Sequence, residues 1–244
     1  MPRPQTRPLA TMALAALALV GLSACSALDH ETFQDDAKAP GKVTAIRIDN
    51  DNGGVRLETS AGVSTVSVHR RVHYRGDKPS GTSFSVHEGV LTLADCGKDC
   101  DVDYVVKAPA GLPVTGSTSD GDLELTGAGP VDVRTSNGEI TVSGAKGPVK
   151  LRTTNGNIDV KDVKGGIDAR TSDGELTVRT ATAQNIKART TNGDLTVTAP
   201  PAPYRITAST SYGDKNVAFK NDPAGTYRLE LATTSGDLTL RPAD

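Results

Sequence analysis

The sequence predicts an all-β protein, a single-domain β-solenoid of short coils with about 18 residues per coil. Val, Thr and Gly recur throughout the 244 residues, whereas Leu, Ala and Glu form no long periodic run outside the N-terminus. This composition favours strands over helices. One Gly returns at a nearly constant interval, and apolar residues alternate with other residues on both sides of it. That alternation indicates two short strands per repeat, each with one buried face.

Residues 1–24 are predicted to be a lipoprotein signal peptide. Two arginines precede an uncharged stretch, residues 8–20, that is rich in Ala and Leu and typical of a secretory signal. The Leu-Ser-Ala-Cys sequence at 22–25 resembles the bacterial lipobox, in which the thiol is acylated and the chain is cleaved before the Cys. We therefore expect lipidation of Cys25 and an extracytoplasmic protein anchored to the cell membrane. The alternatives are an ordinary signal peptide and an uncleaved membrane helix, for which the stretch is short.

Residues 25–40 are predicted to form a flexible tether. The segment is rich in acidic residues, holds few apolar side chains and ends at Pro40. A segment of this composition is not expected to bury a core. The folded part is then expected to stand off the membrane on this arm, as a solenoid domain over residues 41–244.

Residues 41–112 are expected to form irregular coils, and the apolar residues between Ile46 and Leu57 are expected to open the stack. Strand-like runs follow at residues 63–74, 83–93 and 102–107. Breaks rich in Gly and Pro separate them, which indicates wider or distorted coils.

The chain has three cysteines. Lipidation would use Cys25, and an exported protein is expected to hold Cys96 and Cys100 as a disulfide that closes a short loop. A zinc site would need two further ligands, and a redox pair usually has two residues between its thiols. We therefore expect no metal and no cofactor at these cysteines.

Residues 113–244 are expected to form the regular coils. The repeated glycines of the chain are Gly53, Gly121, Gly138, Gly156, Gly174, Gly193, Gly213 and Gly236. Their last six intervals run from 17 to 23 residues, which is typical of a stacked array. Seven and five residues before each Gly, and two and four after it, 30 of 32 side chains are apolar when Ala is counted. These positions are expected to fill the core.

Two architectures fit this pattern, an antiparallel meander of hairpins and a solenoid of stacked coils. Six residues before the Gly, the charge alternates in sign from one repeat to the next, through Asp132, Lys150, Asp168 and Lys187. Such alternation is expected where these residues are direct neighbours on adjacent strands. Three residues before the Gly, Thr recurs in seven successive repeats, where its hydroxyl could bond turn backbone groups. Both observations favour the solenoid.

These features resemble a bacterial extracytoplasmic family with β-strand repeats, whose members are described as "putative adhesins". The resemblance covers residues 41–244 and includes the stretch Tyr-Val-Val-Lys-Ala-Pro at 104–109 and the recurring Asn-Gly and Asp-Gly turns. It implies a β-solenoid at the cell surface. It implies no catalytic residues.

The charge balance disfavours a basic nucleic-acid binder, because the net charge of -2 provides no general attraction for phosphate, and we expect no nucleic-acid partner. The four histidines accompany no nucleophile motif or metal-ligand set, so we expect no catalytic residues and no enzyme. One residue after the Gly lies a column of acidic residues that could bind Ca²⁺ or cleave polyuronate chains. Four residues before the Gly lies a column of arginines. The simplest expectation is that the two columns neutralise each other on the surface.

The sharper hypothesis is that the arginine column binds an extended anionic polymer of the cell wall. The residues are Arg134, Arg152, Arg170 and Arg189. Guanidinium groups at a fixed spacing suit a chain of phosphates or carboxylates. The sequence thus predicts a non-catalytic, lipid-anchored binding or adhesion module for an envelope polymer or a membrane protein. The alternatives are a carbohydrate-active β-helix enzyme and an accessory or sensory envelope lipoprotein.

Overall fold

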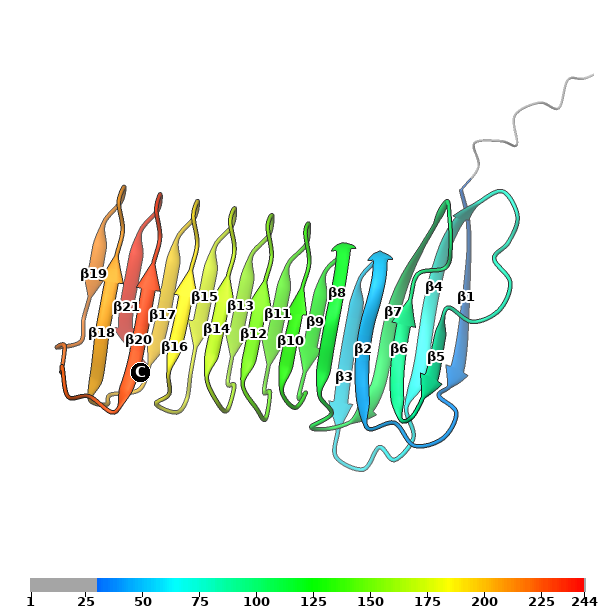
Figure 1. The fold of residues 1–244 in the computed structure, drawn as a ribbon, viewed down its shortest axis with the longest axis horizontal. Coiled ribbons are helices and arrows are strands. Elements are labelled where there is room, and N and C mark those ends of the chain that lie inside the picture. The colour runs from blue at the N-terminus through cyan, green and yellow to red at the C-terminus, as the bar shows by residue number, and fades with distance from the viewer. Residues whose placement is uncertain (1–29, 244) are drawn as a thin grey trace, which may run out of the picture.

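The computed structural model of the chain describes residues 30–243. The predicted signal peptide at 1–24, the lipidation site Cys25 and residues 26–29 of the predicted tether lie outside the described residues and stay predictions. Between residues 30 and 243, all regular secondary structure is β strand, in one 11-stranded and one 10-stranded sheet that run along a rod (Figure 1). No helix within this range is long and apolar enough to cross a membrane. The predicted β-solenoid is confirmed.

Each regular coil places one strand in each sheet. In the 10-stranded sheet these are β8 (Val114–Asp120), β10 (Val131–Arg134), β12 (Val149–Arg152), β14 (Ile167–Arg170), β16 (Ile186–Arg189), β18 (Tyr204–Ser209) and β20 (Tyr227–Ala232). In the 11-stranded sheet they are β9 (Leu123–Thr126), β11 (Ile140–Ser143), β13 (Ile158–Lys161), β15 (Leu176–Arg179), β17 (Leu195–Ala199), β19 (Lys215–Val217) and β21 (Leu238–Pro242). Neighbouring strands of these coils run parallel, which the hairpins of a meander could not do.

The register confirms the predicted alternation of charge. Asp132 lies opposite Lys150, and Lys150 lies opposite Asp168. The Nζ atom of Lys150 is 2.9 Å from a carboxylate oxygen of Asp132. Side chains eighteen residues apart are therefore direct neighbours on adjacent strands.

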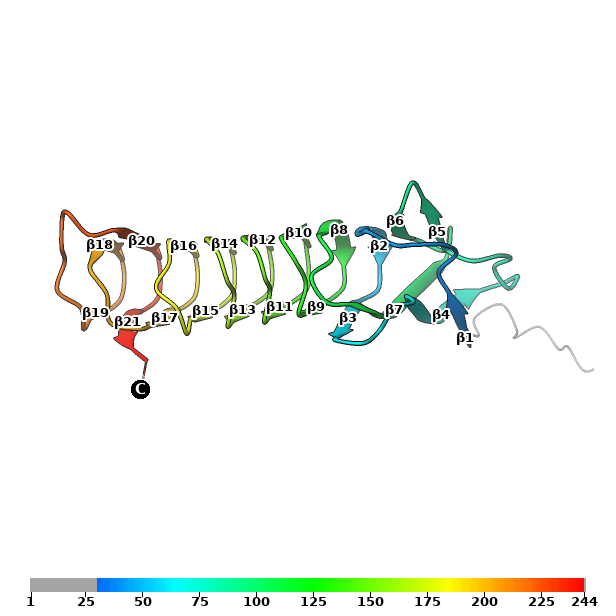
Figure 2. The ribbon, with the colours of Figure 1, turned by 90° about the horizontal axis from the view of Figure 1, so that it is seen from below.

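The interior between the two sheets is narrow and apolar (Figure 2). Ile140, Val142 and Leu151, at predicted core positions, have no exposed surface. The recurring Thr joins the coils at the turn, since Thr153 Oγ1 donates to the carbonyl of Gly138 at 3.1 Å. Six further threonines donate to the carbonyl of a repeated glycine in the neighbouring coil: Thr118, Thr135, Thr171, Thr190, Thr210 and Thr233. The Thr column thus provides the turn hydrogen bonds that its position predicted.

The N-terminal end departs from the order of the sequence. It contains β2 (Ala45–Asn52), β3 (Val55–Ser60), β4 (Ser67–Arg75), β5 (Phe84–His87), β6 (Val90–Ala94) and β7 (Cys100–Pro109). We had expected the coil formed by β2 and β3 to open the stack. This prediction is wrong, because the coil of β6 and β7 lies outside it. The prediction that residues 41–112 all form irregular coils is also wrong in part. Strands β4 and β5 pair antiparallel with the strands of the outermost coil. Antiparallel edge strands end the parallel stacking and cover its open edge.

Residues 30–38 form a strand, β1 (His30–Lys38), and not part of a tether as the composition had predicted. The strand pairs antiparallel with β4 along its whole length. The prediction from the polar composition was wrong, because an edge strand is stabilised by pairing with its neighbour and needs few buried apolar groups. Phe33 supplies one such group, packed edge to face on Tyr74 with ring centroids 5.9 Å apart.

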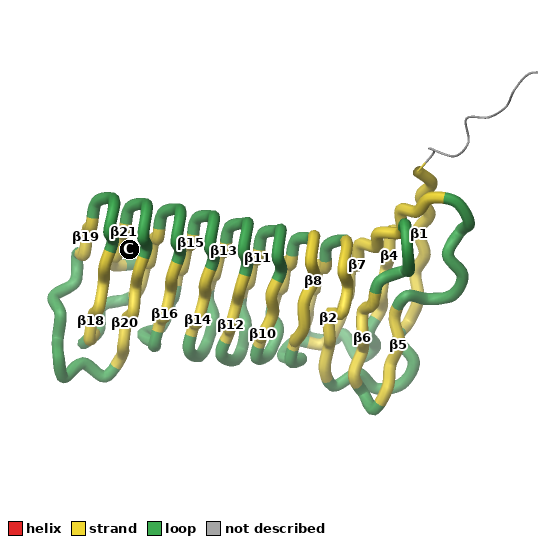
Figure 3. The backbone as a smooth tube through the Cα atoms, turned by 45° about the horizontal axis from the view of Figure 1, so that its top comes forward, coloured by secondary structure: helices red, strands yellow, loops and turns green. Residues whose placement is uncertain are grey.

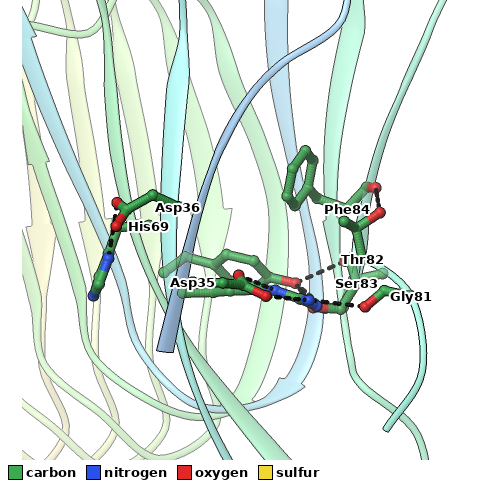
Figure 4. Close-up of polar contacts among 10 residues, drawn as sticks. Asp35, Asp36, His69, Gly81, Thr82, Ser83 and Phe84 are labelled. Carbon is green, nitrogen blue, oxygen red and sulfur yellow. Dashed lines mark hydrogen bonds and ion pairs between the residues drawn. The ribbon is translucent and has the colours of Figure 1, made fainter. Parts of the chain in front are cut away.

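An ion pair between buried Arg70 and the partly exposed Asp35 holds β1 to the rest of the domain (Figure 4). The Arg70 side chain is 5% exposed, and its Nε and Nη2 atoms donate to the two carboxylate oxygens of Asp35 at 2.7 and 2.8 Å. The guanidinium also donates to Ser83 Oγ and to the carbonyl of Gly81. These hydrogen bonds from Arg70 lower the pKa of Asp35. All three nitrogen atoms of the buried guanidinium therefore find acceptors within this end of the rod.

The last two coils at the C-terminal end stack in the reverse of their order in the sequence (Figure 3). The coil formed by β20 and β21 inserts between the coil of β16 and β17 and the terminal coil of β18 and β19. The connection at 200–203 contains three prolines, which favour an extended chain of about 3 Å per residue. It can therefore span two coil spacings, about 10 Å, and leave a place for the coil that follows in the sequence.

Candidate binding surface

Outward positions on six neighbouring strands form a surface that we call the basic face. The strands are β10, β12, β14, β16, β20 and β18. Among the described residues this face carries eight basic side chains, Arg134, Lys150, Arg152, Arg170, Lys187, Arg189, Arg228 and Arg205. It carries three acidic ones, Asp132, Asp168 and Glu230. The excess of positive charge contrasts with the net charge of -2 of the whole chain.

The opposite face of the rod is different. The outward positions of β9, β11, β13, β15, β17 and β21 carry three basic and two acidic residues, and the other seven are Thr or Ser. Positive charge is therefore concentrated on one side of the solenoid.

The four predicted arginines occupy one register position on four successive strands. Arg134 lies opposite Arg152, Arg152 opposite Arg170, and Arg170 opposite Arg189. The structure brings the predicted column together as the repeat required.

Not all four guanidinium groups are available for a ligand. Arg152 makes two contacts with the Asp168 carboxylate, at 3.2 and 3.1 Å, and Arg189 lies 3.6 Å from Glu230. Burial acts to raise the pKa of Asp168, but the hydrogen bond from Arg152 and the positive charges of Arg152, Lys187 and Lys150 together outweigh it, so the pKa is lowered. Arg134 and Arg170 are exposed and have no ion-pair partner among residues 30–243. They are the guanidinium groups most accessible to an anion.

The acidic column does not neutralise the arginines, contrary to the expectation from the sequence. Its side chains accept hydrogen bonds from the backbone of the neighbouring coil: Asp122 accepts from the Glu139 N–H at 2.8 Å, and Asp194 accepts from Asp237. Asn157, which interrupts the column, accepts in the same way from Glu175. The column therefore satisfies turn backbone groups. Among residues 30–243, no three His, Cys, Asp or Glu side chains gather so that they could hold a metal ion.

A groove of about 840 Å³ runs along one edge of the basic face, where the strands of the 10-stranded sheet begin. Pro113, Pro130 and Pro148 line it at equivalent positions of three coils, and Gly166 continues the line. Arg205 and Arg228, from neighbouring strands, line it at the C-terminal end of the rod. The groove thus combines rigid apolar rings with a charged border.

The remaining candidate residues lie at the N-terminal end. Cys96 and Cys100 form a disulfide, with their Cα atoms 5.7 Å apart. His69 and His73 share one face of β4, where His69 Nδ1 lies 3.0 Å from Asp36 and His73 Nδ1 lies 2.8 Å from Thr32 Oγ1. These contacts place both histidines in the pairing of β1 with β4.

The fold and this surface define a class of protein: a parallel β-solenoid of two flat sheets with one basic face. The chain belongs to the Toastrack DUF4097 family, whose model matches residues 112–241, the regular coils. The family resemblance seen in the sequence is confirmed.

Solved structures to which this chain is similar come from several bacteria. One is described as a "putative cell adhesion protein" from Clostridium sporogenes, with 12% identity, a TM-score of 0.40, and coverage of 87% of this chain and 100% of that one. Two are described as a "putative adhesin". The one from Bacteroides fragilis has 13% identity and a TM-score of 0.38, and the one from Parabacteroides distasonis has 13% identity and a TM-score of 0.42. Each alignment covers 87% of this chain and 97% of the other. No curated protein matches the sequence.

Sequence reasoning missed the groove and the arginines at its end. The signal for the groove was a Pro eight residues before Gly121, Gly138 and Gly156. Arg205 and Arg228 occupy the equivalent positions of the last two coils. The exchanged order of these coils, which the sequence did not reveal, places Arg228 next to β16 and Arg205 on the last strand.

Proposed function

We propose that the protein is a non-catalytic binding module of the cell envelope, which holds an extended anionic polymer on its basic face. The main support for this proposal is the charge of the basic face. Its six neighbouring strands carry eight basic and only three acidic side chains, although the chain as a whole has a net negative charge. A row of cations with fixed spacing matches a ligand that repeats its charge along its length.

The location is part of the same proposal. A lipid at Cys25 would anchor the chain to the membrane outside the cytoplasm, where wall polymers are found. The signal sequence and the lipobox support this part. With β1 beginning at residue 30, a short linker would join the anchor to the N-terminal end of the rod. Binding a wall polymer from that position is an adhesion-type role that needs no chemical step.

The accessible arginines give the first test. Replacing Arg134 and Arg170 together by Gln should weaken retention of the full chain on purified cell-wall fragments by about tenfold or more, because two charge-assisted contacts are lost. The measurement is the dissociation constant from co-sedimentation at low ionic strength. Added salt should weaken the wild-type interaction in the same direction.

The matched control removes two positive charges from the opposite face, by Lys161→Gln and Arg241→Gln. This variant should bind within about twofold of the wild type, since exposed charges elsewhere contribute little. Equal losses in both variants would mean that only net charge matters. Unchanged binding in the arginine variant would refute the basic face as the binding site.

A further inference from the structure

The groove beside the basic face offers more than positive charge. It passes seven coils, from Pro113 to Arg205, which at the spacing of adjacent strands is a length of about 29 Å. Its apolar surface comes mainly from the proline rings, because Val131, Val149 and Ile167 along its base point into the core and are almost completely buried. An anion without apolar groups would leave this surface uncovered.

Basic and acidic side chains alternate along most of the border of the groove. Lys150 and Lys187 lie beside the line of Pro and Gly residues and alternate with Asp132, Asp168 and Glu230. Lys150 is paired with Asp132, whereas Lys187 forms no ion pair within residues 30–243. Arg205 and Arg228 lie side by side at the end. Arg228 contacts Glu230 at 3.1 Å, whereas Arg205 has no ion-pair partner among the described residues. A ligand that lies along this groove would meet cations beside an apolar base.

A peptide does not suit this groove. It would have to lie across the strands, whose backbone groups already bond neighbouring strands in the sheet, so no strand edge is offered for β-strand addition. The backbone amides of a bound peptide would lose water without gaining partners. A sugar chain avoids this cost, because its rings have apolar faces and its hydroxyl groups can stay hydrated on the open side.

We infer that the groove binds an acidic polysaccharide, with sugar rings on the line of Pro113, Pro130, Pro148 and Gly166 and carboxylates toward the basic residues. This inference rests on the proposed function and narrows its ligand from any anionic polymer to a glycan with charged rings. Lys150, Lys187, Arg205 and Arg228, which line the groove, hold the charge of the sugar chain, and the groove selects for its rings.

Gly166 allows a test that leaves the charge unchanged. It does not adopt a positive φ, and an added Cβ would find only the Asn185 carbonyl oxygen, at 3.9 Å. Gly166→Trp therefore fills the groove without backbone strain. The controls are Gly166→Ala, which leaves the groove open, and Thr177→Trp, which puts the same ring on the opposite face. Thermal unfolding of each variant confirms that the fold is intact.

The probes for the full chain are a galacturonic acid oligomer, polyphosphate and polyglutamate of similar charge. We expect Gly166→Trp to weaken binding of the galacturonic acid oligomer by about tenfold or more, as expected when a ring contact of this size is lost. Polyphosphate binding should change by less than about twofold, since charge alone holds it. Both controls should bind all probes as the wild type does.

The outcomes separate this inference from the proposed function. If wild-type protein binds none of the three probes, the proposed function fails, and this inference with it. If binding depends on Arg134 and Arg170 but not on Gly166→Trp, the basic face stands and the groove is refuted. If polyglutamate binds as tightly as the sugar and is equally sensitive to Gly166→Trp, the groove is a peptide site and the glycan is refuted.

Discussion

Replacing Gly156 by Ala is expected to destabilise the fold by about 4 kcal/mol, the sum of backbone strain and steric overlap. Gly156 has a φ of 153°, and a Cβ on it would collide with the carbonyl oxygen of Gly138 in the neighbouring coil. That same carbonyl accepts the hydrogen bond from Thr153, so the coil cannot shift without losing this bond as well. The free energy of unfolding, measured in urea, is the quantity to compare.

Gly166→Ala is the matched control. It makes the same chemical change ten residues away, where the backbone conformation suits any residue. Its unfolding free energy should stay within about 1 kcal/mol of the wild-type value, with any change in the stabilising direction. Equal stability of the two variants would show that the close stacking of the turns does not require a glycine at position 156.

Ending the chain at Thr226 is expected to disorder the coil of β18 and β19, although its residues remain present. In the intact protein this coil pairs with β20 and β21 and has no strand of the preceding coil beside it. The prolines between β17 and β18 set a distance that should prevent it from moving into the vacated place. Hydrogen exchange should show amides of β18 and β19 exchanging as in an unfolded chain, because exchange reports local opening.

Coils nearer the N-terminus should keep their protection in the same truncated chain, because coils of a solenoid contact only their neighbours. Strands β12 to β15 serve as the internal reference. If β18 stays protected, the terminal coil can stack directly on β16. The exchanged coil order would then not be required for its stability.

The repeat predicted the regular coils because each physical requirement recurs at a fixed position. The alternating apolar residues, the turn Gly and the Thr hydroxyl each depend on the same residue in the neighbouring coil, so the pattern shows the register. The facing of Asp132 and Lys150 and the column of four arginines follow directly from it.

The ends of the rod could not be predicted in the same way. Which coil lies next to which is decided by the length and stiffness of the connections, as at residues 200–203, and not by the apolar pattern. The strand β1 was missed because the carboxylate of Asp35 and the hydroxyl of Tyr74 find partners far away in the sequence. The role of the acidic column was missed because Asp122 bonds a backbone N–H, which composition does not reveal.

Lysine footprinting tests the basic face most directly. Acetylation rates of the full chain are measured with and without a saturating galacturonic acid oligomer. Lys150 and Lys187 lie on the basic face, whereas Lys161 lies on the opposite face. We expect the ligand to slow acetylation of Lys150 and Lys187 by about tenfold or more and to leave Lys161 unchanged, since buried contacts exclude the reagent. Protection of Lys161 alone, or equal protection of all three lysines, would contradict this expectation.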